Sequence, residues 1–491
     1  MEQPIRFILN DESIETDLHG GTVVLDFLRR HRRLTGTKES CREGDCGACA
    51  VLLGELAVDG QAIVQYRVVN SCLLPLGDIQ GKHLVSIEGI NPPRGGEDAV
   101  DTVALTPVQS QLVVHGAIQC GFCTPGFVVS LTGYLLGQRQ WSFEGAVDAV
   151  AGNICRCTGY ASIKRAIVDL LEQVTGSSRS GSSADAADRG RLETLVACGV
   201  VPAYFLTIGE RLRTLEAPQR QRRRPADYTV VAGGTDLFVQ KAEQLMEESL
   251  SFVSGVSELR QVREESDRLY LGAGISMAEV KELPELRKRL PQLADALPLI
   301  ASAPIRNRAT LGGNIVNASP IADFTVMLLA LGAVLGLKNE KTVRELSLQR
   351  FFRGYKQLDM EPGERLEWIA LPLEEGNFSF EKVSRRRYLD IASVNSAAWI
   401  CHRHGRIEKL RLAAGGVAPI PLYLAQGSAC LEGQELGDEL LEQALDRVQE
   451  EISPISDVRG SERYKRLLLR QLLLAHFIKF FPKRIHAEVW A

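Results

Sequence analysis

Eight of the eleven cysteines fall into two sets of four within the first third of the 491-residue chain. The first set has the spacing C-x4-C-x2-C with one cysteine farther on, as in plant-type [2Fe–2S] proteins. The second set consists of two close pairs. Two iron–sulfur clusters would pass electrons along the chain. The predicted ligands are Cys41, Cys46, Cys49 and Cys72 in the first set, and Cys120, Cys123, Cys155 and Cys157 in the second set.

Disulfide bonds and zinc are the other common uses of cysteine. Disulfide-rich domains are typically short and secreted, whereas this chain is long and residues 1–30 lack the basic start and apolar run of a signal peptide. Zinc ribbons use paired Cys-x2-Cys motifs, which fit the x4 gap and the gap between Cys155 and Cys157 poorly. Spacing favours iron–sulfur in the first set and, taken alone, leaves the second set open. The other cysteines are expected to be core residues: Cys198, Cys401 and Cys430.

Glycines and a predicted small sheet would position the first set. Gly44 and Gly47 lie inside the cysteine loop, where they allow positive φ and let backbone N–H groups turn toward sulfur. Such hydrogen bonds offset the negative charge of a four-thiolate cluster. The apolar stretches at residues 5–10 and 21–28 predict strands followed by a helix. The expected domain is ferredoxin-like.

The second set lies among four stretches with apolar residues at helical spacing. Its cysteine pairs would stand at helix starts, where N–H groups and the helix dipole favour an anionic cluster. Pro125 and Gly159 provide the chain breaks that such turns need. We expect a buried cluster in a helical domain. The predicted helices cover residues 108–118, 127–137, 143–150 and 161–174.

Composition is that of an ordinary globular chain with two to four domains, with 45% hydrophobic and 24% charged residues. The net charge of −4 excludes the basic footprint of a nucleic-acid-binding protein. No apolar run approaches the roughly 18–20 residues that span a bilayer. Iron–sulfur chemistry and unpaired cysteines favour a reducing cytoplasm. A Gly/Ser/Asp-rich stretch at residues 175–190 is predicted to be a flexible linker.

Two Gly-Gly turns follow the linker. Gly233-Gly234 comes after a predicted strand, and Gly312-Gly313 is followed by small polar residues. Such turns let a phosphate approach the backbone, although a plain tight turn is an equal alternative for the first of them. Neither turn has the G-x-G-x-x-G form of a Rossmann site. A dinucleotide bound here would therefore need another fold.

The motifs together resemble a known family. The cysteine motifs at 41–49, 119–126 and 153–160 resemble the two [2Fe–2S] domains of the xanthine oxidase family of molybdenum hydroxylases. The two Gly-Gly segments resemble its FAD domain, which is of the vanillyl-alcohol-oxidase type. Further matching segments, including those like its C-terminal flavoprotein domain, are 351–356, 382–387, 413–419 and 455–464.

The resemblance implies a multidomain α+β protein. Its domain order is similar to that of the small, iron–sulfur and FAD subunit of a bacterial xanthine dehydrogenase. The implied parts are a β-grasp ferredoxin-like [2Fe–2S] domain at 1–85, a four-helix [2Fe–2S] domain at 86–174, the linker at 175–190, the FAD-binding domain at 191–374 and an α+β C-terminal flavoprotein domain at 375–491.

By the same resemblance, the chain is the electron-transfer subunit of an oxidoreductase. A molybdopterin-binding large subunit would hydroxylate xanthine or hypoxanthine, and the assembly would be a dimer of heterodimers. Gln119 and Cys157 would approach the pterin, so electrons would enter at the second set. They would then pass to the first set, to FAD and on to NAD+. A flavin is required because one-electron clusters cannot make a hydride.

The family pattern also implies which residues bind FAD. Leu366 and Lys382 would lie near the isoalloxazine, with Lys382 in a catalytic position. A surface lysine is the alternative for Lys382, because the following Arg-rich stretch is one residue longer than in close relatives. The residues assigned to the two FAD loops are Val230, Val231, Ala232, Gly233, Gly234, Thr235, Asp236, Leu237, Thr310, Gly313, Asn314 and Asp323.

Two departures and two alternatives remain. Ser40 stands where the family often has glycine, and Gly-Gly-Thr-Asp-Leu is closer to carbon-monoxide-dehydrogenase-like flavoproteins, which weakens the purine assignment. The chain could be a stand-alone flavin/iron–sulfur reductase. It could also serve a hydroxylase for an aldehyde, an N-heterocycle or CO with another acceptor. A molybdenum partner predicts an exposed apolar surface around Gln119 and Cys157.

Overall fold

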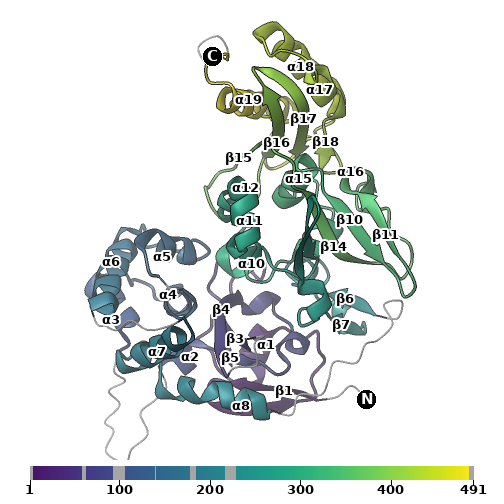
Figure 1. Ribbon diagram of the computed structural model, residues 1–491. Helices are drawn as coiled ribbons and strands as arrows, with labels where there is room; N and C mark the ends of the chain where they lie inside the picture. Colours follow the sequence, from purple (N-terminus) through teal and green to yellow (C-terminus); the bar gives the residue numbers. More distant parts are fainter. Residues whose placement is uncertain are drawn as a thin grey trace, which may run out of the picture. The chain divides into compact units, whose positions relative to one another are not determined.

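The computed structural model describes residues 4–57, 62–91, 105–138, 140–176, 184–215 and 228–485. The chain forms two compact units, each built from segments that are discontinuous in sequence (Figure 1). The described residues of the first unit fall within Met1–Arg223, Gly234–Phe252 and Ser302–Arg308. Those of the second unit fall within Arg224–Gly233, Val253–Ala301 and Ala309–Ala491.

The first unit begins with a mixed five-stranded sheet of order β2-β1-β5-β3-β4, in which β1 and β5 run parallel. A short helix crosses one face and buries Val24 and Leu28 against Phe7 and Val51. This is the predicted β-grasp domain. Its elements are β1 (Ile5–Leu9), β2 (Glu12–Thr16), α1 (Val24–Asp26) with the π-turn Phe27–His31, β3 (Ala50–Leu56), β4 (Val64–Asn70), the 3-10 turns Ser71–Leu73 and Leu76–Ile79, β5 (His83–Val85) and α2 (Ile87–Ile90).

The four predicted helices of the second cysteine domain are all present. Thr106 and Gln109 form a capping box at the start of α3, and Ser142 caps α5. The central helix, α4, is buried throughout residues 126–136 because it packs between the other helices and strands β3 and β4. The helices are α3 (Pro107–Val114), α4 (Thr124–Gly137), α5 (Phe143–Val150) and α6 (Ala161–Gly176).

Residues 191–215 differ from the sequence-based domain assignment. The sequence places them in the flavin domain, but their contacts put them in the first unit. Ile208 and Leu212 pack on Ile8 of the ferredoxin-like sheet, so apolar burial decides where this segment lies. Helix α7 also begins at Ala184, inside the predicted linker, of which 177–183 lie outside the described residues. The elements here are α7 (Ala184–Ala197), the 3-10 turn Ala203–Thr207 and α8 (Ile208–Thr214).

Two segments from later in the chain also belong to the first unit. The second of them, Ser302–Arg308, is held by two mostly buried arginines. The Arg306 guanidinium lies 3.2 Å from the Asp148 carboxylate, and Arg308 pairs with the fully buried Asp78. These elements are α9 (Leu237–Gln240), the 3-10 turn Gln244–Met246, β7 (Leu250–Phe252) and α13 (Ala303–Arg306).

Among its described residues, the second unit has two larger antiparallel sheets with helices packed on them and one small two-stranded sheet. The first sheet, of order β11-β10-β14-β9-β8, shares one core with helices α10, α11, α12, α14 and α15. Its elements are β6 (Thr229–Val231), the 3-10 turn Ser257–Arg260, β8 (Val262–Glu265), β9 (Arg268–Gly272), α10 (Met277–Glu282), α11 (Pro284–Arg289), α12 (Pro291–Ala296), the 3-10 turn Leu297–Leu299, α14 (Leu311–Val316), α15 (Asp323–Ala330), β10 (Val334–Lys338), β11 (Val343–Ser347), α16 (Leu348–Phe351), β12 (Phe352–Gly354), β13 (Gln357–Leu358) and β14 (Arg365–Pro372).

The second sheet, of order β15-β16-β17-β18, carries three helices. Together the two units give the multidomain α+β architecture expected from the sequence. Among the described residues, no helix is both long enough and apolar enough to cross a membrane. The remaining elements are β15 (Asn377–Val383), β16 (Val394–Arg403), β17 (Arg406–Gly415), β18 (Leu422–Tyr423), α17 (Ala425–Leu431), α18 (Asp438–Glu451) and α19 (Glu462–Phe480).

A buried histidine makes the stability of the first unit depend on pH. His83 lies among Tyr66, Tyr204 and Phe205, with its ring nitrogens 2.8 Å from the Tyr66 hydroxyl and from the Asn10 carbonyl. Burial lowers the pKa of His83 from 6.5 to about 4, so the unfolded chain binds a proton before the folded chain does. Stability from this group is therefore present above pH 6.5 and lost as the pH falls toward 4.

We expect this histidine to reduce the free energy of unfolding by up to about 1.4 kcal/mol per pH unit within that window. Denaturant titrations of the wild type and His83→Gln between pH 7 and 4 measure the effect, since the variant lacks this part of the pH dependence. The exposed His31, replaced by glutamine, is the matched control. Identical pH profiles for wild type and His83→Gln would contradict the prediction.

Candidate iron–sulfur and flavin sites

The first cysteine set gathers its sulfur atoms in two pairs. The Sγ atoms of Cys49 and Cys72 are 3.4 Å apart and both residues are buried. The hydrogen bond between them lowers the pKa of Cys49 and raises that of Cys72. Cys41 and Cys46 form the second pair, and the hydrogen bond from Cys41 lowers the pKa of Cys46 to about 6. One sulfur of each pair is thus already stabilised as the thiolate, the form that binds metal.

Backbone geometry in this loop requires glycine. Gly44 has φ +79° and Gly47 has φ +67°, as the sequence predicts. A Cβ at Gly44 would lie 2.7 Å from side-chain atoms of Leu73 and of Ile305 in the same unit, so the position also has no room for a side chain. The Gly44 carbonyl accepts a hydrogen bond from Asn70 Nδ2 at 2.8 Å, which joins the loop to strand β4.

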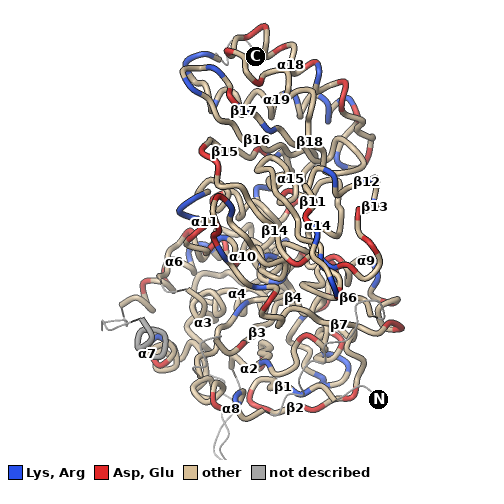
Figure 2. Tube along the Cα trace, turned by 45° about the vertical axis from the view of Figure 1, so that its right-hand side comes forward, with Lys and Arg blue, Asp and Glu red and all other residues tan. Residues whose placement is uncertain are grey.

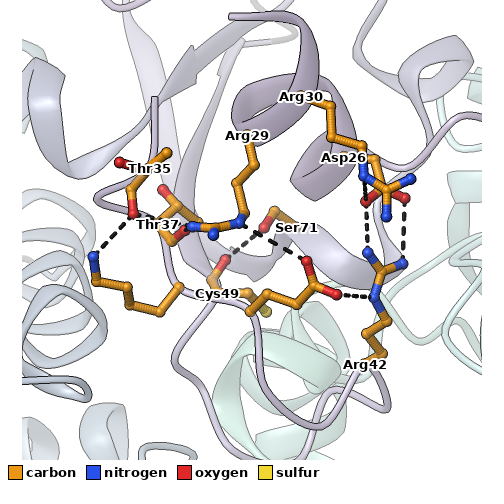
Figure 3. A network of polar contacts seen from close by, with 10 residues as sticks. Asp26, Arg29, Arg30, Thr35, Thr37, Arg42, Cys49 and Ser71 are labelled. Atoms are coloured by element: carbon orange, nitrogen blue, oxygen red, sulfur yellow. Dashed lines mark hydrogen bonds and ion pairs between the residues drawn. The ribbon is translucent and has the colours of Figure 1, made fainter. Parts of the chain in front are cut away.

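A polar network holds the loop against the first helix (Figure 3). Arg42 donates to both carboxylate oxygens of Asp26, at 2.6 and 3.2 Å, and to Glu39 at 2.6 Å. The Ser71 hydroxyl donates to the Cys49 carbonyl at 2.7 Å. Arg42 itself has φ +57°, which the bidentate ion pair stabilises. These contacts place the cysteine loop without using the sulfur atoms themselves.

The second set also forms two pairs, but it is only partly buried. The Sγ atoms of Cys120 and Cys157 are 3.7 Å apart and both residues are exposed, so the expected burial of this set is wrong for half of its members. Its loops project beyond the helix ends, and Cys123 caps the start of α4 as predicted. Burial raises the pKa of Cys123 to about 12. For Cys155, burial is outweighed by hydrogen bonds from Thr158, and its pKa is lowered.

The pairing distinguishes a two-iron cluster from a single zinc ion. Two sulfurs bound at about 2.3 Å to one tetrahedral ion lie roughly 3.8 Å apart. The Cys49–Cys72 and Cys120–Cys157 pairs, at 3.4 and 3.7 Å, are close to this spacing. Among the described residues, no three His, Cys, Asp or Glu side chains converge on one metal position. Each set therefore offers two ligands to each of two metal ions, as a [2Fe–2S] cluster requires. The donor atoms fit that cofactor.

The two predicted FAD loops are turns at the starts of short helices. In the first, β6 ends at Val231, Gly234 has φ +74°, and α9 starts at Leu237. In the second, the Thr310 hydroxyl accepts from the Gly313 N–H at 3.0 Å. Asn314 accepts from the Thr325 hydroxyl at 2.9 Å, which ties the turn to α15. In the second turn, the Gly312 and Asn314 N–H groups are also bonded within the chain, to the Ala273 and Thr310 carbonyls. Both segments place glycine just before a helix start, a position where phosphate groups commonly bind.

Lys382 is a buried residue of the second unit, which excludes the surface-lysine alternative. Its side chain is only 4% exposed, and Nζ lies 2.7 Å from Asp323 Oδ2 and 2.9 Å from the Leu299 carbonyl. Burial raises the pKa of Asp323, and the Lys382 ammonium and the Asn395 amide act against that shift. Two residues assigned to FAD from the sequence therefore form one ion pair. Leu366, in contrast, lies in β14 as part of the sheet core.

Sequence reasoning missed two asparagines that organise these sites. Asn395 donates to Asp323 and to the Ile321 carbonyl, and Asn153 donates to the Gly47 carbonyl. Asn153 directly precedes the Ile-Cys-Arg-Cys motif, so its position next to the ligands was a usable signal. Asn395 lies in an ordinary strand, where nothing in the pattern sets it apart.

Four family models match successive parts of the chain. They are the 2Fe-2S iron–sulfur cluster binding domain at residues 7–76, the [2Fe-2S] binding domain at 87–168, the FAD binding domain in molybdopterin dehydrogenase at 210–374 and the CO dehydrogenase flavoprotein C-terminal domain at 379–480. The fold and the cysteine pairs define an iron–sulfur flavoprotein. These domains match the iron–sulfur and FAD part of xanthine dehydrogenase-family molybdenum hydroxylases, with which the chain aligns.

Similar proteins include the xanthine dehydrogenase of Drosophila subobscura, which is 30% identical over 99% of this chain and 40% of its own length. The xanthine dehydrogenase/oxidase of Rattus norvegicus is 27% identical over 98% of this chain and 39% of its own length. The chain thus spans about two fifths of these relatives. Among solved structures, a carbon monoxide dehydrogenase chain from Hydrogenophaga pseudoflava has a TM-score of 0.48 and 29% identity, covering 50% of this chain and 87% of that one.

Loss of one cysteine should remove one cluster and leave the other. We expect Cys157→Ser to halve the iron content and to abolish one of two [2Fe–2S] signals in low-temperature EPR of the reduced chain, because each set is held by its own two pairs. Iron analysis and EPR measure this. Cys430→Ser, outside both sets, is the matched control and should retain all iron. Loss of both signals in Cys157→Ser would contradict two independently held clusters.

Removal of the Lys382 ammonium should leave Asp323 as a buried, unpaired charge. We expect Lys382→Met to lower the free energy of unfolding by about 3 kcal/mol at pH 8. The pKa of Asp323 is already raised by burial, so the folded variant takes up a proton more readily than the unfolded chain, and lowering the pH restores stability.

Denaturant titrations at pH 8 and pH 5 measure this recovery. The double variant Lys382→Met/Asp323→Asn has no buried charge and should show no such pH dependence. A loss in Lys382→Met that is equal at both pH values would show that packing, rather than charge, accounts for it.

Proposed function

We propose that this chain is the electron-transfer part of an oxidoreductase that hydroxylates xanthine or hypoxanthine. Electrons arrive from a molybdopterin-binding partner subunit and cross the second and then the first cysteine set. They leave through FAD to NAD+. The observation that carries the proposal is an exposed apolar surface beside the second cysteine set.

Most of that surface lacks charge, with the exposed Arg156 between Cys155 and Cys157 as an exception. Residues 105–138 contain no Lys, Arg, Asp or Glu, and helices α3 and α4 carry no charged positions in Figure 2. The contact between Cys120 and Cys157 brings the two cysteine stretches together. Large exposed apolar patches mark sites of protein association. The exposed side chains are Val113, Val114, Ile118, Phe122, Ile154 and Tyr160, with Val114 72% and Phe122 45% exposed.

The difference in burial between the two sets supports the direction of transfer. Gln119, Cys120 and Cys157 are exposed at this surface, where a partner's cofactor can approach. Cys49 and Cys72 of the first set are buried inside the same unit. Electrons therefore enter at the second set and move inward.

FAD is proposed to bind at Val230–Leu237 and at Thr310, Gly313 and Asn314, with Lys382 and Leu366 toward the isoalloxazine. Bound FAD supplies hydride chemistry that the clusters lack. Lys382 Nζ offers a fixed positive charge there, because Asp323 and the Leu299 carbonyl hold it in place.

The substrate assignment rests on the names of similar proteins, which also include the aldehyde oxidase 2 of Macaca fascicularis at 25% identity. An aldehyde, an N-heterocycle or CO is the alternative substrate, with another electron acceptor. A dimer of heterodimers in a reducing cytoplasm completes the proposal. A reductase that acts without any partner is the competing function.

Anaerobic reduction of the purified native complex by xanthine tests the proposal. We expect the flavin absorbance to bleach and two [2Fe–2S] EPR signals to appear, and NAD+ to reverse both. If xanthine has no effect while NADH reduces all centres, the result supports the proposed electron-transfer path and contradicts a purine substrate. A chain that purifies alone with full activity would contradict the proposal that it needs a molybdopterin-binding partner subunit.

The apolar surface has its own test. Phe122→Asp should abolish co-purification of a molybdopterin-containing chain, because it places a charge in the proposed interface. Val343→Asp, at a position 49% exposed in the second unit, is the matched control and should leave co-purification intact. Unchanged co-purification of Phe122→Asp would show that the interface with the partner lies elsewhere on the chain.

A further inference from the structure

The loops that carry the two cysteine sets bind each other directly inside the first unit. The Cys46 carbonyl accepts a hydrogen bond from the Ile154 N–H at 3.0 Å. The neighbouring Gly47 carbonyl accepts from Asn153 Nδ2 at 3.1 Å. Two adjacent carbonyls of one ligand loop are thus fastened to two adjacent residues of the other, and Ile154 immediately precedes Cys155.

Glycines make this contact possible. A Cβ at Gly47 would lie 2.5 Å from the Gly152 carbonyl oxygen and 2.6 Å from Asn153 Nδ2. A Cβ at Gly126, in the first turn of α4, would overlap the Gly47 carbonyl oxygen. Three ligand-bearing segments therefore meet at glycine backbone and at the Asn153 side chain, and any side chain at Gly47 or Gly126 would push them apart.

The buried side chain of Asn153 carries an energetic penalty that a purely structural role does not explain. It is 4% exposed, and its Oδ1 has no hydrogen-bond partner among the described residues. A buried polar atom without a hydrogen-bond partner destabilises a fold. Leucine has a similar size and no such atom. However, leucine has no N–H group in its side chain and cannot donate a hydrogen bond to the Gly47 carbonyl.

We propose that Asn153 is a positioning residue that fixes the separation of the two clusters, so that an electron passes between them through the Cys155–Ile154–Cys46 backbone. The path consists of covalent bonds and the single Ile154 N–H to Cys46 carbonyl hydrogen bond. One electron leaves the second set and one arrives at the first, so no proton or leaving group moves. The inference rests on the proposed iron–sulfur content and adds the contact that couples the clusters.

Low-temperature EPR of the dithionite-reduced full chain tests it. Two paramagnetic clusters held close together split each other's signals, and we expect this splitting in the wild type. In Asn153→Leu, both signals should persist with unchanged iron content, whereas their mutual splitting should be lost. A role in stability alone would leave the splitting in place, and a thermal unfolding scan records any change in stability separately.

Gly126→Ala is a second, independent variant. Alanine favours a helix more than glycine does, so the cost lies in the overlap with the Gly47 carbonyl and in the close approach to Asn153 Nδ2. We expect the same loss of splitting. Gly190→Ala is the matched helical control, because a Cβ there meets no atom within 4 Å. Thr132→Val controls for Asn153→Leu, since its buried hydroxyl also lacks a partner among the described residues.

The outcomes separate this inference from the proposed function. Absence of both iron–sulfur signals in the wild type would overturn the proposed function, and this inference with it. Two signals without mutual splitting would overturn the inference alone. Splitting that survives in both Asn153→Leu and Gly126→Ala would also overturn it. If Asn153→Leu fails to fold, the splitting of the EPR signals in Gly126→Ala tests the inference instead.

Discussion

The first unit depends on one constraint: eight thiol ligands must be held in pairs, close to one another, without side chains filling the space between them. Thiolates repel each other and need hydrogen-bond donors, so the loops are built from glycine and turned backbone. Gly44 and Gly47 accept left-handed backbone for this purpose. Surrounding ion pairs, such as that of Arg42 with Asp26, hold the loops from outside.

Several separate parts of the chain pack into the first unit, which contains both cysteine sets. Helix α4 serves both sets, because its start carries Cys123 and its body packs on strands β3 and β4. Segments from far along the sequence, 191–215 and Ser302–Arg308, add apolar cover and buried ion pairs to that unit. Arg308, which pairs with Asp78 in the first unit, lies two residues before Thr310 in the sequence.

The second unit contains buried charges, which are stabilised because they form an ion pair. Asp323 and Lys382 are buried together, with the Asn395 amide as a further donor to Asp323. A buried ion pair seldom adds net stability, so its retention suits a site that needs a fixed charge. The proposed flavin position supplies that need. The C-terminal sheet matters here because β15 and β16 carry Lys382 and Asn395.

Local sequence determined what depends on short-range spacing. The cysteine motifs, the positive-φ glycines and the four helices around the second set follow from residues close together in the chain, and the structure has them at the predicted places. Tertiary structure alone decided what depends on contacts between distant residues. It paired the sulfur atoms, left Cys120 and Cys157 exposed and joined Asn153 to Gly47 across more than a hundred residues. It also moved 191–215 into the first unit and buried Lys382 beside Asp323. The spacing of residues along the chain determines which backbone turns are possible. The burial of side chains and the pairing of sulfur atoms and charges depend on which distant segments pack against each other and exclude water.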